Sequence, residues 1–179
     1  MDFKTSKTYQ NLQQAMNTKS DTAVNYMIYG ETAKAEGYIE IGNVYDEYAS
    51  QEREHVKILM RIMGEGELPN TSRNLRESAD IEDFFWQKLF ISYADTAKEE
   101  GFDDIAKIFE GIASADRQHG FVFNQLEKNV DTNRVFCKNI QEVWICIKCG
   151  NVFWGYCAPD ICPLCGYPQG YYRIDCTKY

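Results

Sequence analysis

Two short segments each place an acidic side chain three residues before a histidine. QEREH contains Glu52 and His55, and ADRQH contains Asp116 and His119; the chain has no other histidine. On a helix, positions i and i+3 lie on one face, so each carboxylate and its imidazole point the same way. Carboxylate oxygen with imidazole nitrogen suits iron or manganese. One such pair would indicate a surface ion pair, but two in the same local pattern predict a metal site.

A repeat links these two segments. Residues 33–55 match residues 97–119 without a gap, sharing Ala-Lys, Glu-Gly-aromatic and acid-x-x-His at equivalent positions. Duplicated helical hairpins are typical of a pseudo-symmetric four-helix bundle. Such a bundle directs both acid-histidine pairs towards its centre, in the carboxylate-bridged two-metal arrangement of ferritin-like proteins.

Helical periodicity dominates the first 130 residues, which contain a single proline, Pro69. It predicts helices over residues 6–36, 38–63 and 81–100, and a fourth helix from Gly101 to about Lys128. Residues 64–74, GEGELPNTSRN, are rich in turn formers and predict a connection.

The composition changes after residue 134, and all seven cysteines lie in this last part. Two CxxC pairs, Cys146 with Cys149 and Cys162 with Cys165, stand twelve residues apart. Four thiolates in a tetrahedron suit iron or zinc, so the spacing predicts a four-cysteine metal site among short strands. The alternative is a zinc ribbon that only stabilises a small fold.

The glycines after the two CxxC pairs, Gly150 and Gly166, permit the tight turn that each pair requires. The remaining three cysteines, Cys137, Cys157 and Cys176, are interpreted as packing residues. Cysteines clustered at ligand spacing also indicate a reducing compartment, and the sequence predicts a cytoplasmic location.

The charge balance excludes some partners. The formal net charge is −8 and the sequence pI is about 4.8. Nucleic acid and anionic membranes both favour a basic face, so neither is an expected partner. No apolar run approaches the length that spans a membrane.

The sequence closely resembles the rubrerythrin family along nearly its whole length. The most specific segments are QEREH (51–55), AKEEGF (97–102) and WICIKCG with CPLCGYP (144–150 and 162–168). The resemblance implies a mainly α fold, with a ferritin-like four-helix bundle over residues 1–134 and a rubredoxin-like Fe(Cys)4 domain over residues 135–179.

The resemblance also implies an activity. It implies a peroxidase that reduces hydrogen peroxide in oxidative stress defence, with electrons from an NAD(P)H-dependent reductase or from rubredoxin. It further implies a cytoplasmic homodimer.

The resemblance assigns ligands residue by residue. Iron in the bundle would be held by Glu52, His55, Glu82, Asp116 and His119, and iron or zinc in the last domain by Cys146, Cys149, Cys162 and Cys165. Tyr26 and Tyr93 match tyrosines beside the family's site, where each could donate to a carboxylate or serve only in packing.

Asp116 is shorter than the glutamate that is usual in the family at that position, and two further positions lose the expected ligand altogether. Lys19 and Phe85 stand where the resemblance predicts glutamate ligands of one of the two metals. Our hypothesis is that the Lys19 ammonium replaces that metal and neutralises Glu52 and Asp116, which leaves a bundle site with one metal or none. The alternative is that Lys19 extends to solvent and a distorted two-metal site persists.

These departures weaken the expectation of peroxidase activity. The alternative function is a divergent member of the family that carries electrons, binds metal or interacts with a partner without being a peroxidase.

Overall fold

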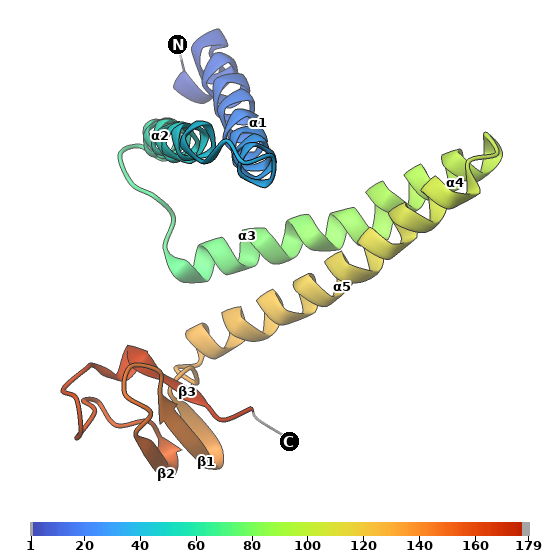
Figure 1. Cartoon of the computed structure of the whole chain (residues 1–179). Helices are drawn as coiled ribbons and strands as arrows, with labels where there is room; N and C mark the ends of the chain where they lie inside the picture. Colours follow the sequence, from blue (N-terminus) through green and yellow to red (C-terminus); the bar gives the residue numbers. More distant parts are fainter. Residues whose placement is uncertain (1, 177–179) are drawn as a thin grey trace. The chain divides into compact units, whose positions relative to one another are not determined.

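The computed structural model describes residues 2–176, which form long helices followed by a small antiparallel sheet (Figure 1). A short 3-10 turn, η1 (Phe3–Thr5), precedes the helices. The helical elements are α1 (Lys7–Ala35), α2 (Ile39–Met63), α3 (Thr71–Phe84), the π-helix η2 (Phe85–Leu89), α4 (Phe90–Glu99) and α5 (Asp103–Asp131). Because α3, η2 and α4 are continuous, the described residues form four long helical segments. This confirms the mainly α class with a small β domain.

Local chemistry explains several of the helix boundaries. The Ser6 hydroxyl accepts a hydrogen bond from the Tyr9 backbone N–H at 3.1 Å and caps α1. Gly37 lies in the tight turn between α1 and α2, and Gly101 lies in the tight turn between α4 and α5. Their positive φ angles of 91° and 83° favour glycine. The first helical hairpin is thus α1 with α2, and the second is the segment α3–η2–α4 with α5.

The predicted start of the third helix near Ile81 is wrong, because α3 begins at Thr71. The side chain of Asn70 accepts a hydrogen bond from the Arg73 backbone N–H at 2.9 Å and caps the helix there. Part of the segment predicted as a connection is therefore helical.

The repeat is visible in the packing of each hairpin. Gly30 of α1 and Gly42 of α2 approach closely, and the positions 64 residues further on are the buried Ala94 and Ala106. The ion pairs that join the helices recur too: Lys34 with Asp46, and Lys98 with Glu110 at 2.5 Å. Both hairpins thus use small residues and one ion pair at equivalent places.

Gly42→Ala should destabilise the chain, whereas Gly111→Ala should stabilise it. A methyl group at position 42 would overlap Cγ of Lys34 and lie 2.9 Å from the Gly30 carbonyl oxygen, but one at position 111 meets nothing within 4 Å. Overpacking at Gly42 should cost about 1–3 kcal/mol of unfolding free energy, while helix propensity at Gly111 should add about 0.5–1 kcal/mol. Urea unfolding of both full-length variants measures these changes in unfolding free energy. Changes of the same sign in the two variants would contradict the close approach of Gly42 to Gly30.

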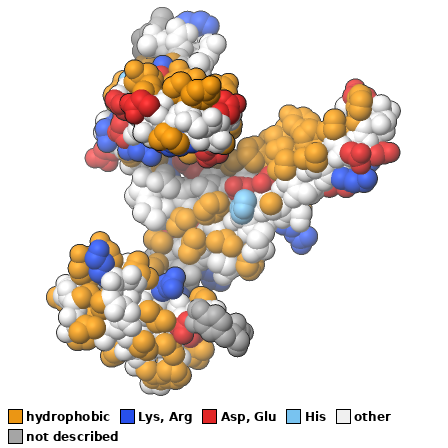
Figure 2. All heavy atoms as spheres, viewed as in Figure 1, with side chains coloured by type: hydrophobic (Ala, Val, Ile, Leu, Met, Phe, Trp, Pro, Cys, Tyr) orange, Lys and Arg blue, Asp and Glu red, His pale blue; other side chains and the backbone are white. Residues whose placement is uncertain are grey.

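The chain divides into two compact units, residues 1–69 and 70–179. Within each unit a helical hairpin leaves large apolar side chains about half exposed, such as Val24 and Met27 in the first and Ile108 and Phe121 in the second. Figure 2 shows hydrophobic side chains over broad stretches of the helices. A two-helix layer buries only one side, so these faces need a further layer. The domain boundary at residue 134 stays a prediction.

The last part of the chain forms a three-stranded antiparallel sheet in the order β2-β1-β3. Its strands are β1 (Cys137–Cys146), β2 (Val152–Cys157) and β3 (Tyr172–Ile174); the 3-10 turn η3 (Gln169–Tyr171) leads into β3. The buried cluster beside the sheet consists of Trp144, Cys146, Ala158, Cys162 and Tyr172. The core of this small domain therefore contains two of the four predicted cysteine ligands.

Within residues 2–176, none of the helices combines the length and the hydrophobicity needed to cross a lipid bilayer.

Candidate metal centres

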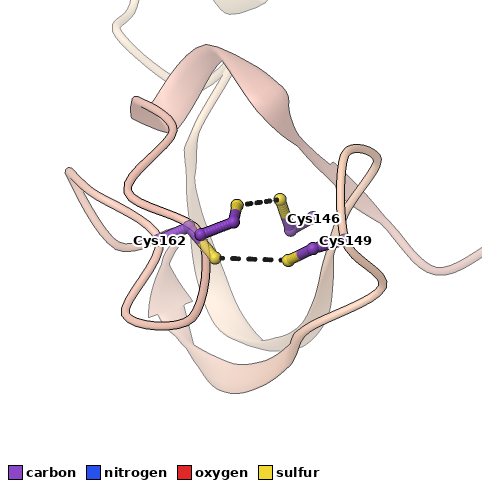
Figure 3. Close-up of side chains that lie close together, drawn as sticks. Cys146, Cys149 and Cys162 are labelled. Atoms are coloured by element: carbon purple, nitrogen blue, oxygen red, sulfur yellow. Dashed lines mark hydrogen bonds between the residues drawn. The ribbon is translucent and has the colours of Figure 1, made fainter.

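The four cysteines of the two CxxC pairs converge in the β domain, with their sulfur atoms facing one another (Figure 3). The Sγ atoms of Cys146 and Cys165 are 3.8 Å apart, and those of Cys149 and Cys162 are 3.6 Å apart. A tetrahedral ion with metal–sulfur bonds of about 2.3 Å requires sulfur–sulfur distances of about 3.8 Å. The arrangement therefore fits a single four-coordinate metal ion.

Each cysteine pair lies on a tight turn of the same design. Cys146 N–H donates to the Asn151 carbonyl at 2.9 Å, and Cys162 N–H donates to the Tyr167 carbonyl at 2.8 Å. Gly150 and Gly166 close the turns with positive φ angles of 78° and 73°. The two turns predicted from the glycine positions are thus present in the structure.

The thiol pKa values show how charge is distributed without a metal. Burial opposes ionisation of Cys162, but hydrogen bonds from the Tyr172 hydroxyl and nearby backbone N–H groups lower its pKa to about 6. A backbone hydrogen bond from Asn151 lowers the pKa of Cys149, but burial and the neighbouring cysteines outweigh it and raise that pKa to about 12. A bound cation would hold Cys149 as a thiolate despite this raised pKa, which matches the chemistry of a metal centre.

A second group of possible metal ligands lies within the second hairpin, on α3 and α5. Glu82, Asp116 and His119 offer ligand atoms that all lie within 4.8 Å of one another. His119 Nδ1 is 3.7 Å from Glu82 Oε2 and 3.9 Å from Asp116 Oδ1. Asp116 is 9% exposed, and its Oδ2 is buried without any hydrogen-bond partner among the described residues. Because a buried carboxylate oxygen without a partner is costly, the cluster fits a bound cation.

Two small residues allow this cluster to form. A methyl group at Gly120 of α5 would lie only 3.0 Å from Oδ1 of Asp83 and 3.4 Å from Cβ of Glu82, and Ala79 of α3 is itself buried. The close approach of α3 to α5 brings Glu82 beside the acid-histidine pair of α5.

The first hairpin places its own acid-histidine pair in a different environment. Lys19 Nζ lies 2.9 Å from both carboxylate oxygens of Glu52, and His55 Nδ1 lies 3.0 Å from Glu52 Oε2. The hydrogen bond from Lys19, and then that from His55, holds the pKa of Glu52 below its usual 4.5. Both oxygens of Glu52 therefore already have a cationic or imidazole partner.

Lys19 and Glu82 occupy equivalent places in the two hairpins. The segment from Glu82 to Gly101 is one residue longer than the segment from Lys19 to Gly37. The π-helix accommodates the extra residue, since Phe90 N–H bonds to the carbonyl of Phe85, five residues back. Each hairpin thus sets one charged side chain against its acid-histidine pair, a cation in the first and an anion in the second.

Comparison with known proteins identifies the family. The rubrerythrin family model matches residues 10–127. The chain belongs to the rubrerythrin family. Rubrerythrin-1 of Clostridium acetobutylicum is 37% identical, with 99% of this chain and 98% of the relative covered. Rubrerythrin of Nitratidesulfovibrio vulgaris is 32% identical, with 96% of each chain covered.

The family assignment makes this chain a non-haem iron protein of the rubrerythrin type. Among solved structures, mixed-valence nigerythrin is 20% identical, with a TM-score of 0.36 over 94% of this chain and 86% of that one.

The resemblance to rubrerythrin predicts a glutamate ligand at position 85, but Phe85 offers no oxygen. Phe85 begins the π-helix and packs against Phe90 with ring centroids 5.8 Å apart. The candidate tyrosines of the rubrerythrin pattern also make aromatic contacts, Tyr26 with Tyr45 at 5.7 Å and Tyr93 with Phe109 at 5.6 Å. Their roles beside a metal stay predictions.

The structure agrees with one element of the Lys19 hypothesis, the contact with Glu52, while replacement of a metal by Lys19 stays a prediction. The ammonium contacts Glu52 rather than extending freely into solvent. Its predicted effect on Asp116, which lies in the other unit, stays a prediction.

The interpretation of three cysteines as packing residues is wrong. Cys137 and Cys157 form a disulfide, and Cys176 is exposed. Sequence reasoning missed the disulfide because Cys137 and Cys157 are brought face to face only by the register of β1 on β2.

Replacing Lys19 should make the metal-free chain more sensitive to acid. The lowered pKa of Glu52 gives a stabilisation that is present above pH 4.5 and is lost as the pH falls through the lower folded-state pKa. Lys19→Met removes the main cause, so the acid-unfolding midpoint, followed by circular dichroism, should move to higher pH. The control is Lys107→Met, which breaks a more exposed pair with Asp104. An equal shift in both variants would contradict this account.

Proposed function

We propose that the protein carries electrons from a four-cysteine iron centre to a single metal ion held by Glu82, Asp116 and His119, where hydrogen peroxide is reduced to water. The observation that carries the proposal is the buried Oδ2 of Asp116, which has no hydrogen-bond partner among the described residues. It contrasts with Glu52, its counterpart in the repeat, whose oxygens are both engaged by Lys19.

Under this proposal the bundle residues have different roles. Glu82 and Asp116 offer carboxylate oxygens and His119 offers an imidazole nitrogen, a donor set that suits iron. The side chain of His119 is 57% exposed within its own unit. When bound, iron supplies one-electron redox chemistry that these side chains lack. The role of Lys19 is to keep Glu52 charged and occupied, which makes a second metal unnecessary.

The four-cysteine centre supplies the electrons in this scheme. Reduction of hydrogen peroxide to two water molecules consumes two electrons and two protons. The four-cysteine iron and the bundle iron would supply one electron each, so an external donor must reduce both centres again after each peroxide. An NAD(P)H-dependent reductase or a rubredoxin is the proposed donor. A homodimer is the proposed assembly, and the apolar faces that each hairpin leaves exposed are consistent with an interface.

A second candidate function is electron carriage or metal binding without peroxidase activity. The ion pair between Lys19 and Glu52 favours it, because this pair replaces ligands that a two-metal centre needs. Phe85 favours it too, since a phenyl ring cannot bind a metal.

The two acidic residues of the repeat provide a matched test. Asp116→Asn should lower both iron binding in the bundle and peroxide turnover by roughly tenfold or more, since losing a ligand is at least as severe as losing a partner that orients one. Glu52→Gln should change both by less than about twofold, because Glu52 does not hold the metal in this account. The measurement is anaerobic reoxidation of the reduced four-cysteine centre by hydrogen peroxide.

Equal losses of iron binding and of peroxide turnover in Asp116→Asn and Glu52→Gln would contradict a single-metal site. If peroxide fails to reoxidise the wild-type centre although iron fills both sites, the protein is a carrier and not a peroxidase.

A further inference from the structure

The β domain contains a covalent link that is separate from the four-cysteine cluster. Cys137, the first residue of β1, faces Cys157, the last residue of β2, in the antiparallel register. Their Cα atoms are 4.0 Å apart and their sulfurs are bonded. Neither residue belongs to the group of cysteines that could hold the metal.

The disulfide lies where the backbone pairing of the two strands is interrupted. The register is irregular between the Cys137–Cys157 pair and the next pair, Glu142 with Gly155. Next to the disulfide, Ala158 N–H donates to the Phe136 carbonyl at 2.8 Å. The disulfide therefore holds an end of the ladder that continuous strand pairing does not secure.

This end of the ladder packs onto the metal ligands. Ala158 belongs to the buried cluster that contains Cys146 and Cys162, and Phe136 packs against the same cluster. The disulfide also closes a loop that contains Cys146 and Cys149. Closing this loop limits how far the ligands can separate when the domain opens.

The disulfide is open to attack by external thiols. Cys157 is exposed, whereas Cys137 is half-buried. The four ligand cysteines must be reduced to bind a metal, so conditions that load the metal also favour attack on this disulfide. Disulfides in reducing surroundings are usually transient and redox-active.

We propose that Cys137 and Cys157 form a second redox site, a disulfide that exchanges with a dithiol reductant and that, while formed, slows release of metal from the four-cysteine centre. A thiolate of the reductant attacks Sγ of Cys157, and Cys137 leaves as a thiolate. The second thiol of the reductant then attacks the mixed disulfide and releases Cys157. The chain gains two electrons and two protons, and the reductant becomes a disulfide. The partner class is a protein with a reactive dithiol.

The first experiment measures the exchange itself. The metal-loaded full-length chain is equilibrated with mixtures of reduced and oxidised dithiothreitol, its free thiols are alkylated, and the labelled peptides are identified by mass spectrometry. Cys137 and Cys157 should interconvert between disulfide and thiols together, and a Cys176→Ser variant should behave identically. A disulfide that excess dithiothreitol leaves intact in the folded chain would overturn the proposal, as would a disulfide formed with Cys176.

The second experiment measures metal release to a chromophoric chelator. Release from the disulfide form should be roughly tenfold slower than from the reduced form, because the reduced loop is free to open. A Cys137→Ser/Cys157→Ser variant should release metal at the rate of the reduced wild type, with or without dithiothreitol. Equal rates for the two wild-type forms would overturn the proposal even if the variant fails to fold.

Discussion

A variant carrying Lys19→Glu and Phe85→Glu is expected to bind one more metal ion per chain than the wild type. The two changes supply the carboxylates that the rubrerythrin pattern predicts, and the first removes an ammonium group bound to Glu52. At about 4 Å and an effective dielectric of about 20, each pair of unit charges contributes roughly 4 kcal/mol. Reversing the charge at position 19 turns repulsion of a cation into attraction of similar size. Metal analysis of anaerobically purified protein measures the result.

The control for this variant is Lys19→Met with Phe85→Leu, which removes the ammonium and adds no ligand. It should bind no more bundle metal than the wild type, since charge removal alone supplies no oxygen. Peroxide turnover of the double glutamate variant should rise with its metal content. If the wild type already binds two bundle metals and the glutamate variant gains none, Lys19 does not replace a metal.

Cys162→Ser should abolish metal binding in the β domain and unfold that domain. Cys162 is 1% exposed and packs with Trp144 and Cys146, so the ligand is also part of the core. Metal binding by four cysteines contributes on the order of 10 kcal/mol to folding in small domains. The expected signature is loss of the metal–thiolate absorption, with a red shift of the fluorescence as the buried Trp144 becomes exposed.

The matched control is Cys176→Ser, because Cys176 is exposed and lies outside the metal-binding group. It should keep both the absorption and the fluorescence of the wild type. A Cys162→Ser chain that retained a full complement of metal in this domain would show that the four sulfurs do not act together.

The sequence predicted those features that depend on short-range spacing. The CxxC pairs and their glycines indicate two tight turns, because ligand spacing and backbone freedom are local properties. The acid-x-x-His pairs share a helix face for the same reason, and the 64-residue repeat predicted two similar hairpins. All of these features are present.

Features that depend on a competition between local signals, or on contacts distant in sequence, could not be predicted. The early start of α3 at Thr71 depends on one capping side chain, Asn70, within a segment of turn formers. The one-residue insertion in the second hairpin becomes interpretable only when the π-helix shows where it is accommodated. The disulfide depends on strand register, which one-residue shifts would change.

The central claim is that Lys19 has replaced one metal, so that the bundle of this rubrerythrin-family protein holds a single ion. The most direct measurement is the iron content per chain of anaerobically purified wild-type protein, with its visible spectrum. The account predicts about two irons per chain at full loading, one at the four-cysteine centre and one at Glu82, Asp116 and His119. About three irons per chain would contradict it, because both bundle positions would then be filled despite Lys19.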